Sequence, residues 1–364
     1  MNDASTFMGL LERLRRDPQA AARAAAARGE RVIGYVGNDI PVALLLAANA
    51  LPVRLRASTD LTPTSADNFV ESSFAWPQRV IADQWLKGAL DHLDAVVFSR
   101  GDDSGQRLYY YVCELQRRGL CKGPRPLLYD VAGLARPTSF EHTLDSTRLL
   151  AGQLGSAAHR LEAALQRVRR REQLAQAVRA RRLLPAPVRG SAAWAYEFAA
   201  PCDWRDAFDE AVGPWLERTD LLPMPLRVLL AGDPQPDDQL HLAIEAGGAS
   251  IVQELTESTA AAERTQRDPF AAIAEEFQRR ESPALAMRAN GRWLVDHARE
   301  RRVDAVLLWL SEEDEALPWE IARQLRSLRD ANIPTLLLAR QPAHVSAASL
   351  TQVMNFLRDL RKAS

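Results

Sequence analysis

Short apolar runs alternate with helical patterns along most of this chain, and that alternation most constrains its fold. Residues 31–35 (RVIGY) are typical of a buried strand. The Gly-Asn-Asp turn that follows leads into a helix, for which Pro41 suits the first turn and Asn38 or Asp39 the cap. Strands that alternate with helices form parallel sheets. The first part therefore predicts a parallel sheet with strands at residues 31–35, 52–56, 94–99 and 126–129.

The second part of the chain repeats this plan. Strands are expected at residues 226–231, 249–252, 304–310 and 334–339, with helices at 237–245, 317–330 and from about 347. In both parts a strand that begins D-A-V leads into an acidic loop, FSRGDDSG or WLSEEDEAL, and then into a helix. In open parallel sheets, ligands bind outside the carboxyl ends of the strands. A ligand site between two lobes is the prediction, and two merely solvated loops are the alternative.

A stretch without strands separates the two parts. Residues 139–182 are rich in Ala, Leu, Arg and Gln, which predicts a helical connector. Its basic residues, from Arg160 to Arg182, either form a solvated face or bind phosphates. The apolar side chains of one helical face are Leu161, Leu165, Val168, Ala175 and Val178. The predicted organisation is an N-terminal helix (1–30), a first α/β lobe (31–138), the connector (139–223) and a second α/β lobe (224–364).

Charge and hydropathy exclude several classes of partner. The chain has 46 Lys and Arg against 47 Asp and Glu, so no net field favours nucleic acid or an anionic membrane. No apolar run approaches the roughly 20 residues that cross a bilayer. The N-terminus has acids and arginines where a secretory peptide needs an apolar core, so a cytoplasmic location is expected.

The cysteines and histidines show no metal or catalytic spacing. Cys113, Cys121 and Cys202 are odd in number and widely separated, so free or buried thiols are expected. The six histidines lack H-x-x-H or H-E-x-x-H spacing, and neither a G-x-S-x-G elbow nor a G-x-G-x-x-G turn occurs. Zinc, hydrolase and dinucleotide sites are not predicted.

Several stretches together resemble the 2-hydroxyacyl-CoA dehydratase family, of the 2-hydroxyglutaryl-CoA dehydratase D-component and benzoyl-CoA reductase subunit type. GYVGNDIPVALLLAANALPVRL is similar to the family's opening strand, helix and A-A-G-x-x-P-V-R-L segment. LDAVVFSRGDDSGQRLYYYVCEL resembles L-D-G-V-V-x-P-N-T-C-D-x-x-R-R-L-Y. VDAVLLWLSEEDEALPWEIARQL resembles V-D-G-V-I-F-x-x-x-x-F-C-D-P and its helix. The resemblance implies two Rossmann-like lobes, with a [4Fe-4S] cluster and an acyl-CoA in the cleft between them.

The sequence departs from the family at the cluster ligands. The family's three cluster cysteines fall at Asp67, Asp102 and Asp314, and a further family cysteine falls near Thr256. Carboxylates suit hard cations and are poor replacements for thiolates around an iron–sulfide core. The cluster is therefore predicted to be absent, and radical dehydration with it. The three aspartates are candidate catalytic residues, as an acid–base group or an oxygen-ligand metal site, or they are simply polar loop residues.

Three functions follow from the resemblance. The leading expectation is a cluster-free relative that binds an acyl-CoA-like ligand in the cleft, as a binding protein or as a non-redox, lyase-like enzyme. The first alternative is a non-catalytic subunit that pairs with a cluster-bearing homologue or with a second copy. The second is an active dehydratase whose cluster is held unusually. Arg54, Arg107 and Ser72 lie in the matching segments and are expected to contact the ligand, or the arginines only to pair with neighbouring acids.

Overall fold

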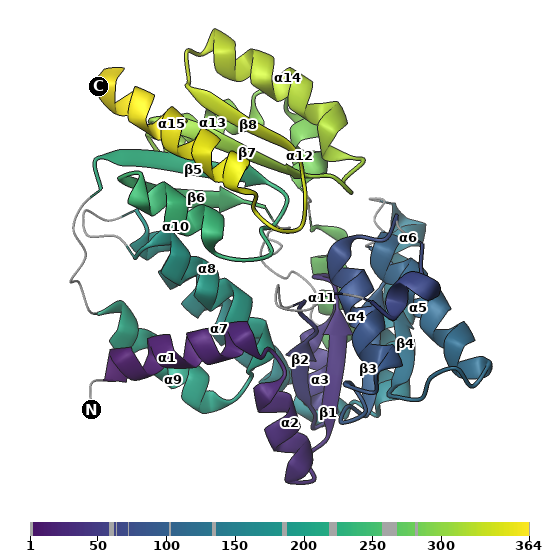
Figure 1. Cartoon of the computed structure of the whole chain (residues 1–364). Coiled ribbons are helices and arrows are strands. Elements are labelled where there is room, and N and C mark those ends of the chain that lie inside the picture. Colours follow the sequence, from purple (N-terminus) through teal and green to yellow (C-terminus); the bar gives the residue numbers. More distant parts are fainter. Residues whose placement is uncertain are drawn as a thin grey trace.

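The computed structural model describes residues 3–57, 62, 64–71, 73–101, 103–132, 136–183, 188–217, 224–256, 268–280 and 283–363. In these residues the chain forms two four-stranded parallel sheets covered by helices (Figure 1). The predicted α/β fold with two parallel-sheet lobes is confirmed. No helix in these ranges is long and apolar enough to cross a membrane.

The first sheet has the strand order β2-β1-β3-β4, and every neighbouring pair is parallel. Its strands are β1 (Val32–Val36), β2 (Leu51–Arg54), β3 (Ala95–Ser99) and β4 (Arg125–Tyr129). All residues of β1 and β3 are buried, as expected of strands covered on both faces. The carboxylate of Asp94, just before β3, accepts a hydrogen bond from the Val32 N–H at 2.8 Å. The aspartate of the D-A-V pattern thus ties together the amino ends of the two central strands.

Helices cover both faces of this sheet. On one face, α2 (Ala20–Ala27), α4 (Trp76–Leu86) and α5 (Asp103–Arg117) pack on the even-numbered side chains of β1 and β3. On the other, α3 (Val42–Ala47) and α6 (Pro137–Leu154) pack on the odd-numbered ones. The residue that caps α3 is Pro41, with no side-chain cap, so the expected cap by Asn38 or Asp39 is wrong.

The second sheet repeats the topology with the order β6-β5-β7-β8. Asp304 accepts a hydrogen bond from the Arg227 N–H at 2.7 Å and so repeats the contact that Asp94 makes in the first sheet. The strands are β5 (Leu226–Gly232), β6 (Ala249–Leu255), β7 (Ala305–Ser311) and β8 (Thr335–Gln341). The covering helices are α10 (Gln239–Ala246), α12 (Pro283–Ala289), α13 (Trp293–Glu300), α14 (Leu317–Asp330) and α15 (Ala347–Ala363).

The described part of the predicted connector, residues 139–223, contains four helices. The first, α6, ends at Gly155, which adopts a left-handed conformation, and α7 (Ala158–Arg181) follows. With α1 (Asp3–Arg16), α8 (Gly190–Ala199) and α9 (Asp206–Leu216), the second half of α7 forms a helical body with its own aromatic core. Two single 3-10 turns, η1 (Ala66–Asn68) and η2 (Ala200–Cys202), complete the described elements. The connector therefore both covers the first sheet and adjoins the second, where α8 packs near β6 (Figure 1).

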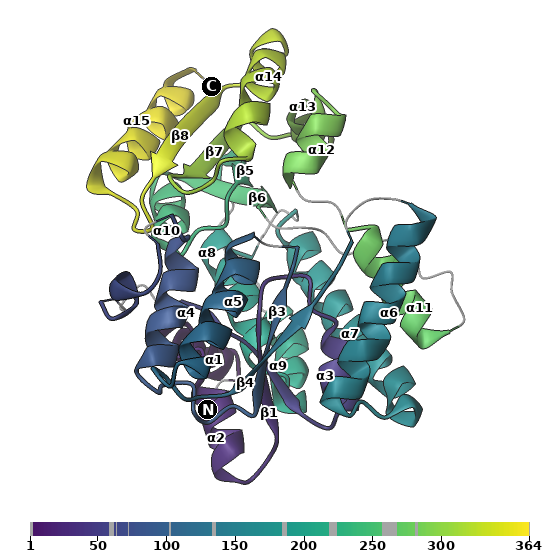
Figure 2. The ribbon, with the colours of Figure 1, turned by 90° about the vertical axis from the view of Figure 1, so that its right-hand side faces the viewer.

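One helix crosses from the second half of the chain to the first lobe. After β6, helix α11 (Pro269–Gln278) packs beside α6, and Figure 2 shows it among the first-lobe helices. Ile273 and Phe277 are buried in the core of the first lobe, and the Phe277 ring lies 5.5 Å from that of Tyr129. The chain then returns to the second lobe at α12. The first lobe is thus completed by residues from far along the sequence.

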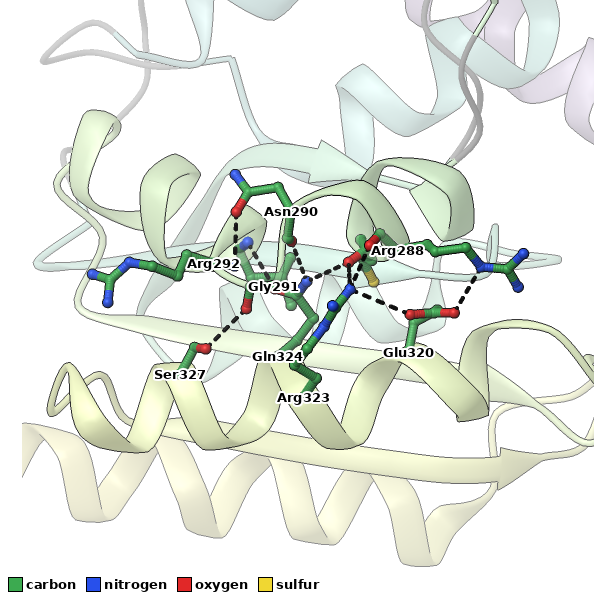
Figure 3. Close-up of polar contacts among 10 residues, drawn as sticks. Arg288, Asn290, Gly291, Arg292, Glu320, Arg323, Gln324 and Ser327 are labelled. Atoms are coloured by element: carbon green, nitrogen blue, oxygen red, sulfur yellow. Dashed lines mark hydrogen bonds and ion pairs between the residues drawn. The ribbon is translucent and has the colours of Figure 1, made fainter. Parts of the chain in front are cut away.

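The α12–α13 turn is fixed by polar side chains of α14 (Figure 3). Arg323 donates to the carbonyls of Met287 and Arg288 at 2.7 and 2.6 Å. The side-chain amide of Gln324 donates through Nε2 to the carbonyls of Met287 and Asn290, at 3.1 and 2.7 Å, and its Oε1 accepts from the Leu294 N–H. The last carbonyls of a helix have no hydrogen-bond donors within that helix. At the end of α12, the side chains of Arg323 and Gln324 are the donors.

Gly232 ends β5 in a conformation that only glycine adopts easily, with φ of 114°. A Cβ at this position would collide with the Trp309 carbonyl oxygen of the neighbouring strand. We expect Gly232→Ala to lower the free energy of unfolding by about 2–4 kcal/mol, measured by urea denaturation. Gly152→Ala is the matched control, because a Cβ there meets nothing and alanine favours the helix. Equal stability of Gly232→Ala and the wild type would contradict the expectation.

Candidate functional site

Both sheets have a topological switch point. The chain leaves the first strand of each sheet to one side and returns on the other, so the crossovers diverge between β1 and β3 and between β5 and β7. In open α/β sheets, ligands bind at such points, outside the carboxyl ends of the strands. The residues that follow these four strands are therefore the first candidates for a site.

At the first switch point, Asp39 faces the turn after β3. The Asp39 carboxylate lies so close to Gly101 that a Cβ there would collide with it, and the Gly101 N–H donates to the Ser99 hydroxyl at 2.9 Å. Burial raises the pKa of Asp39, while the guanidinium groups of Arg280 and Arg54 oppose that rise. A half-buried carboxylate with nearby cations therefore marks this end of the first lobe.

The second switch point has the same arrangement. Asp233 directly follows β5, and its carboxylate accepts a hydrogen bond from the Ser311 N–H, at the end of β7, at 2.6 Å. Asp314 lies in the same turn: its N–H donates to the Ser311 hydroxyl, and its carboxylate accepts from the N–H groups of Ala316 and Leu317 at 2.6 and 2.8 Å. Asp314 thus caps the start of α14 and meets Asp233.

The pKa of Asp233 is raised to about 7. Burial is the main cause, followed by the hydrogen bond with the Asp314 carboxyl and the repulsion between the two charges, while hydrogen bonds from Ser311 act in the opposite direction. A carboxyl with this pKa exchanges its proton near neutral pH. It has the property that a general acid or base requires.

A cavity of about 560 Å³ lies between the lobes and the connector. Ligand pockets commonly have volumes of about 300–1,000 Å³. Asn38 and Arg56 line it from the first lobe, and Pro234 and Gln235 from the loop after β5. The carboxyl end of β6 contributes residues 252–256, which include Thr256, near the position of a family cysteine. The cavity therefore adjoins residues that follow strands of both sheets.

Arginines and glutamates dominate the polar wall of the cavity. Its lining includes five arginines and three glutamates, an excess of positive charge. The arginines are Arg56, Arg179, Arg182, Arg280 and Arg301, and the glutamates are Glu172, Glu197 and Glu254. Arginine is the side chain best suited to bind phosphate and carboxylate groups. The wall favours an anionic ligand.

Arg182 and Glu254 form a buried ion pair at 2.7 Å in this wall, and His241 approaches the same carboxylate oxygen at 3.2 Å. Burial alone would raise the pKa of Glu254, but Arg182 and His241 lower it to about 2. Arg182 also donates to the Ile251 carbonyl at 2.9 Å, which joins the connector to β6. The expected solvated face of the connector is therefore interrupted at Arg182, which is buried.

The other arginines of the wall are also oriented by acids or aromatic rings. Arg179 pairs with Glu197 at 2.9 Å and with Glu172 at 3.2 Å. Arg280 donates to the Asn38 carbonyl, pairs with Glu276 and lies 4.2 Å above the Phe277 ring. Their positions are thus set by the protein before any ligand binds.

An aromatic part of the wall comes from α8. Trp194 and Phe198 both line the cavity, with ring centroids 5.2 Å apart. The guanidinium of Arg56 lies 5.1 Å from the Phe198 centroid, and its Nη2 donates to the Glu197 carbonyl. Aromatic and guanidinium planes side by side suit a ligand that has both a flat ring and charged groups.

The predicted site residues lie in different places. Asp67, on η1, is half-exposed and pairs with Arg79 of α4, and no contact in the described residues joins it to Asp314. Arg107 pairs with Asp103 at 3.0 Å and with Glu71 at 3.5 Å, above the Phe74 ring, and does not line the cavity. Arg54 lies in β2 near Asp39. Asp102 and Ser72 lie outside the described residues.

The three cysteines are free, as expected. Cys202 is fully buried, donates to the carbonyls of Arg54 and Phe198, and has its pKa raised by burial to about 11. Burial also raises the pKa of Cys113 and of Cys121. In the part of the chain described, no three His, Cys, Asp or Glu side chains are arranged to hold a metal ion.

Arg179 and Arg182 of the cavity wall fall in the basic stretch that the sequence offered either as a phosphate-binding or as a solvated face. Sequence reasoning missed Asp233, Gln235 and the other three arginines of the wall. The only signal for the first two was their place directly after a strand, in the A-G-D-P-Q-P turn. The three arginines lie apart from one another in the sequence, so no local motif marks them.

Comparison with known proteins supports the resemblance seen in the sequence. The family model described as 2-hydroxyglutaryl-CoA dehydratase, D-component, matches residues 38–357. No curated protein matches the chain. Among solved structures, it is similar to one described as a complex of SsGBP with GDP, with 12% identity, covering 92% of this chain and 99% of that one. The TM-score of that pair is 0.24, too low to carry an argument about function.

The raised pKa of Asp233 predicts a pH dependence of stability. Between about pH 4 and pH 7 the folded state binds more protons than the unfolded state, so the free energy of unfolding falls as pH rises, by at most about 4 kcal/mol. We expect Asp233→Asn to remove most of this slope, measured by urea denaturation at a series of pH values. Asp67→Asn, at a half-exposed carboxylate, should keep it. Parallel curves for Asp233→Asn and the wild type would contradict the assignment.

Proposed function

The chain belongs to the 2-hydroxyglutaryl-CoA dehydratase D-component family, and we propose that it binds an acyl-CoA-like ligand in the interlobe cavity without an iron–sulfur cluster. The observation that carries the proposal is the arginine-rich wall of the cavity. Coenzyme A has phosphate groups and a flat adenine ring, and the cavity offers arginines together with Trp194 and Phe198. The residues that line the cavity come from both lobes and the connector, as a site in an interlobe cleft requires.

Preorganisation of the wall supports ligand binding. Arg179, Arg182 and Arg280 are each held by a carboxylate, so fewer side-chain conformations are lost when an anion binds. Glu276 and Glu300, which pair with Arg280 and Arg301, do not line the cavity, so the lining itself has five arginines against three glutamates. An anion in the cavity would face this excess of arginine.

The residues present do not fit a [4Fe-4S] cluster. The Asp67 carboxylate is paired with Arg79, and that of Asp314 caps α14. Cys202 is fully buried, its thiol donates to the carbonyls of Arg54 and Phe198, and it does not line the cavity. The chemistry of these groups supports a protein that does not carry out radical dehydration.

Any reaction at this site would be a proton transfer. Asp233 adjoins Pro234 and Gln235, which line the cavity, and it titrates near neutral pH. Asp233 itself does not line the cavity, so a ligand against Pro234 would lie one residue away from a group that can accept or donate a proton. The proposal is therefore a binding protein or a non-redox, lyase-like enzyme, in which Asp233 holds the mobile proton.

Calorimetric titration of the full chain with acetyl-CoA tests the binding proposal. We expect saturable binding that weakens as salt rises, and a loss of about tenfold in affinity for Arg301→Gln, which removes a guanidinium of the wall. Arg299→Gln is the matched control, because Arg299 is exposed on the same helix and does not line the cavity. Absence of binding by the wild type would overturn the proposal.

Anaerobic reconstitution with iron and sulfide tests the absence of the cluster. We expect no stoichiometric iron and no broad charge-transfer absorption, because the described side chains at the family's ligand positions are engaged carboxylates. A variant with serine at Cys113, Cys121 and Cys202 measures adventitious iron. About four irons per wild-type chain, above the level in that variant, would show that a cluster is bound.

A further inference from the structure

The loop after β5 carries a buried amide at the cavity. Its sequence is D-P-Q-P-D, residues 233–237, and Gln235 at its centre lines the cavity. Gln235 is only 6% exposed. One proline precedes it and another follows it. A long polar side chain that is buried needs hydrogen-bond partners for both ends of its amide.

Only one end of this amide has a partner. The Gln235 Nε2 donates to the Asp233 carbonyl at 2.6 Å, and only the NH₂ end of the amide can make that contact. The Oε1 therefore points to the other side, where it has no hydrogen-bond partner among the described residues. A buried acceptor without a donor costs about 1–3 kcal/mol.

No N–H group of the loop donates to Oε1 in the described structure. Pro234 and Pro236 have no N–H. The N–H of Asp233 is used by the Trp309 carbonyl, and that of Gln239 by the Asp237 carboxylate. The nearest backbone donor on the neighbouring strand end, the Ser311 N–H, is used by the Asp233 carboxylate. A donor for Oε1 has to come from elsewhere.

We propose that Gln235 is a specificity-determining residue, whose Oε1 accepts a hydrogen bond from an N–H or O–H group of the ligand in the cavity. The inference rests on the proposed function and deepens it, because it adds a requirement to the charge of the ligand. The ligand class is then an anion that also carries a hydrogen-bond donor at a fixed distance from its charged groups. A plain polyanion such as pyrophosphate lacks that donor.

Coenzyme A has several donors that meet this requirement: the adenine amino group, the amide N–H groups of the pantetheine arm, and the hydroxyl groups of the ribose and of that arm. All of them are N–H or O–H groups in a molecule that also carries phosphates. Site-built acceptors discriminate strongly between ligands with and without the matching donor, because the unmatched acceptor stays buried and unpaired.

Calorimetric titration with acetyl-CoA compares the wild type with Gln235→Leu, which keeps the size of the side chain and removes the acceptor. We expect about a 5- to 20-fold loss of affinity. Gln173→Leu is the matched control: Gln173 is exposed on α7 and does not line the cavity, so its replacement should change affinity less than about twofold. Pyrophosphate should bind the wild type and Gln235→Leu equally.

Gln235→Met provides a second variant, because methionine has the length of glutamine without its amide. Both replacements also remove the contact with the Asp233 carbonyl, so circular dichroism has to show that each variant folds, and unchanged binding of pyrophosphate has to show that the arginine wall is intact. The same loss in both variants supports the inference, and repeating the titration with adenosine 3′,5′-bisphosphate and with pantetheine shows which part of coenzyme A supplies the donor. If the wild type binds acetyl-CoA and both folded variants bind it equally well, the inference fails while the proposed function stands. If the wild type does not bind acetyl-CoA, both fail.

Discussion

Parallel pairing is the constraint on which the rest of this structure depends. A parallel sheet places the carboxyl ends of all its strands at one edge, and the two edges of this protein supply residues to the same cavity. The opposite edges are fixed by the aspartates of the repeated D-A-V pattern, Asp94 and Asp304, which accept hydrogen bonds from N–H groups in the first two residues of the neighbouring strands. Each lobe thus has a fixed end that holds the register and a second end where polar loops are available for binding.

The arginines at the cavity end of the lobes are paired with carboxylates of the protein before any ligand binds. A buried guanidinium without a partner would cost several kcal/mol. Arg182 avoids that cost through Glu254 and the Ile251 carbonyl, and Arg171, deeper in the connector, does so through Asp209. The same carboxylates orient the arginines. Stability of the apo protein and readiness for an anion therefore have one physical origin.

The strands and the lobe plan could be predicted because they are local patterns. A run such as residues 305–310 is apolar throughout only when both faces of its strand are covered. The site was harder to predict, because it depends on contacts between distant residues. Asp314 was found from a motif, but its neighbour Asp233 belongs to another strand, and only the order of the strands brings the two together. Asp67 follows the same motif logic, yet pairing with Arg79 occupies its carboxylate.

The position of α11 could not be predicted either, since an apolar helix face does not say which lobe it covers. Its consequence concerns the order of synthesis. The core around Tyr129 and the α6 helix is complete only when Ile273 and Phe277 have left the ribosome. By then β5 and β6 of the second lobe have already been made. The core of the first lobe can therefore be completed only after part of the second lobe has been synthesised. The two lobes cannot fold to completion one after the other in the order of the sequence.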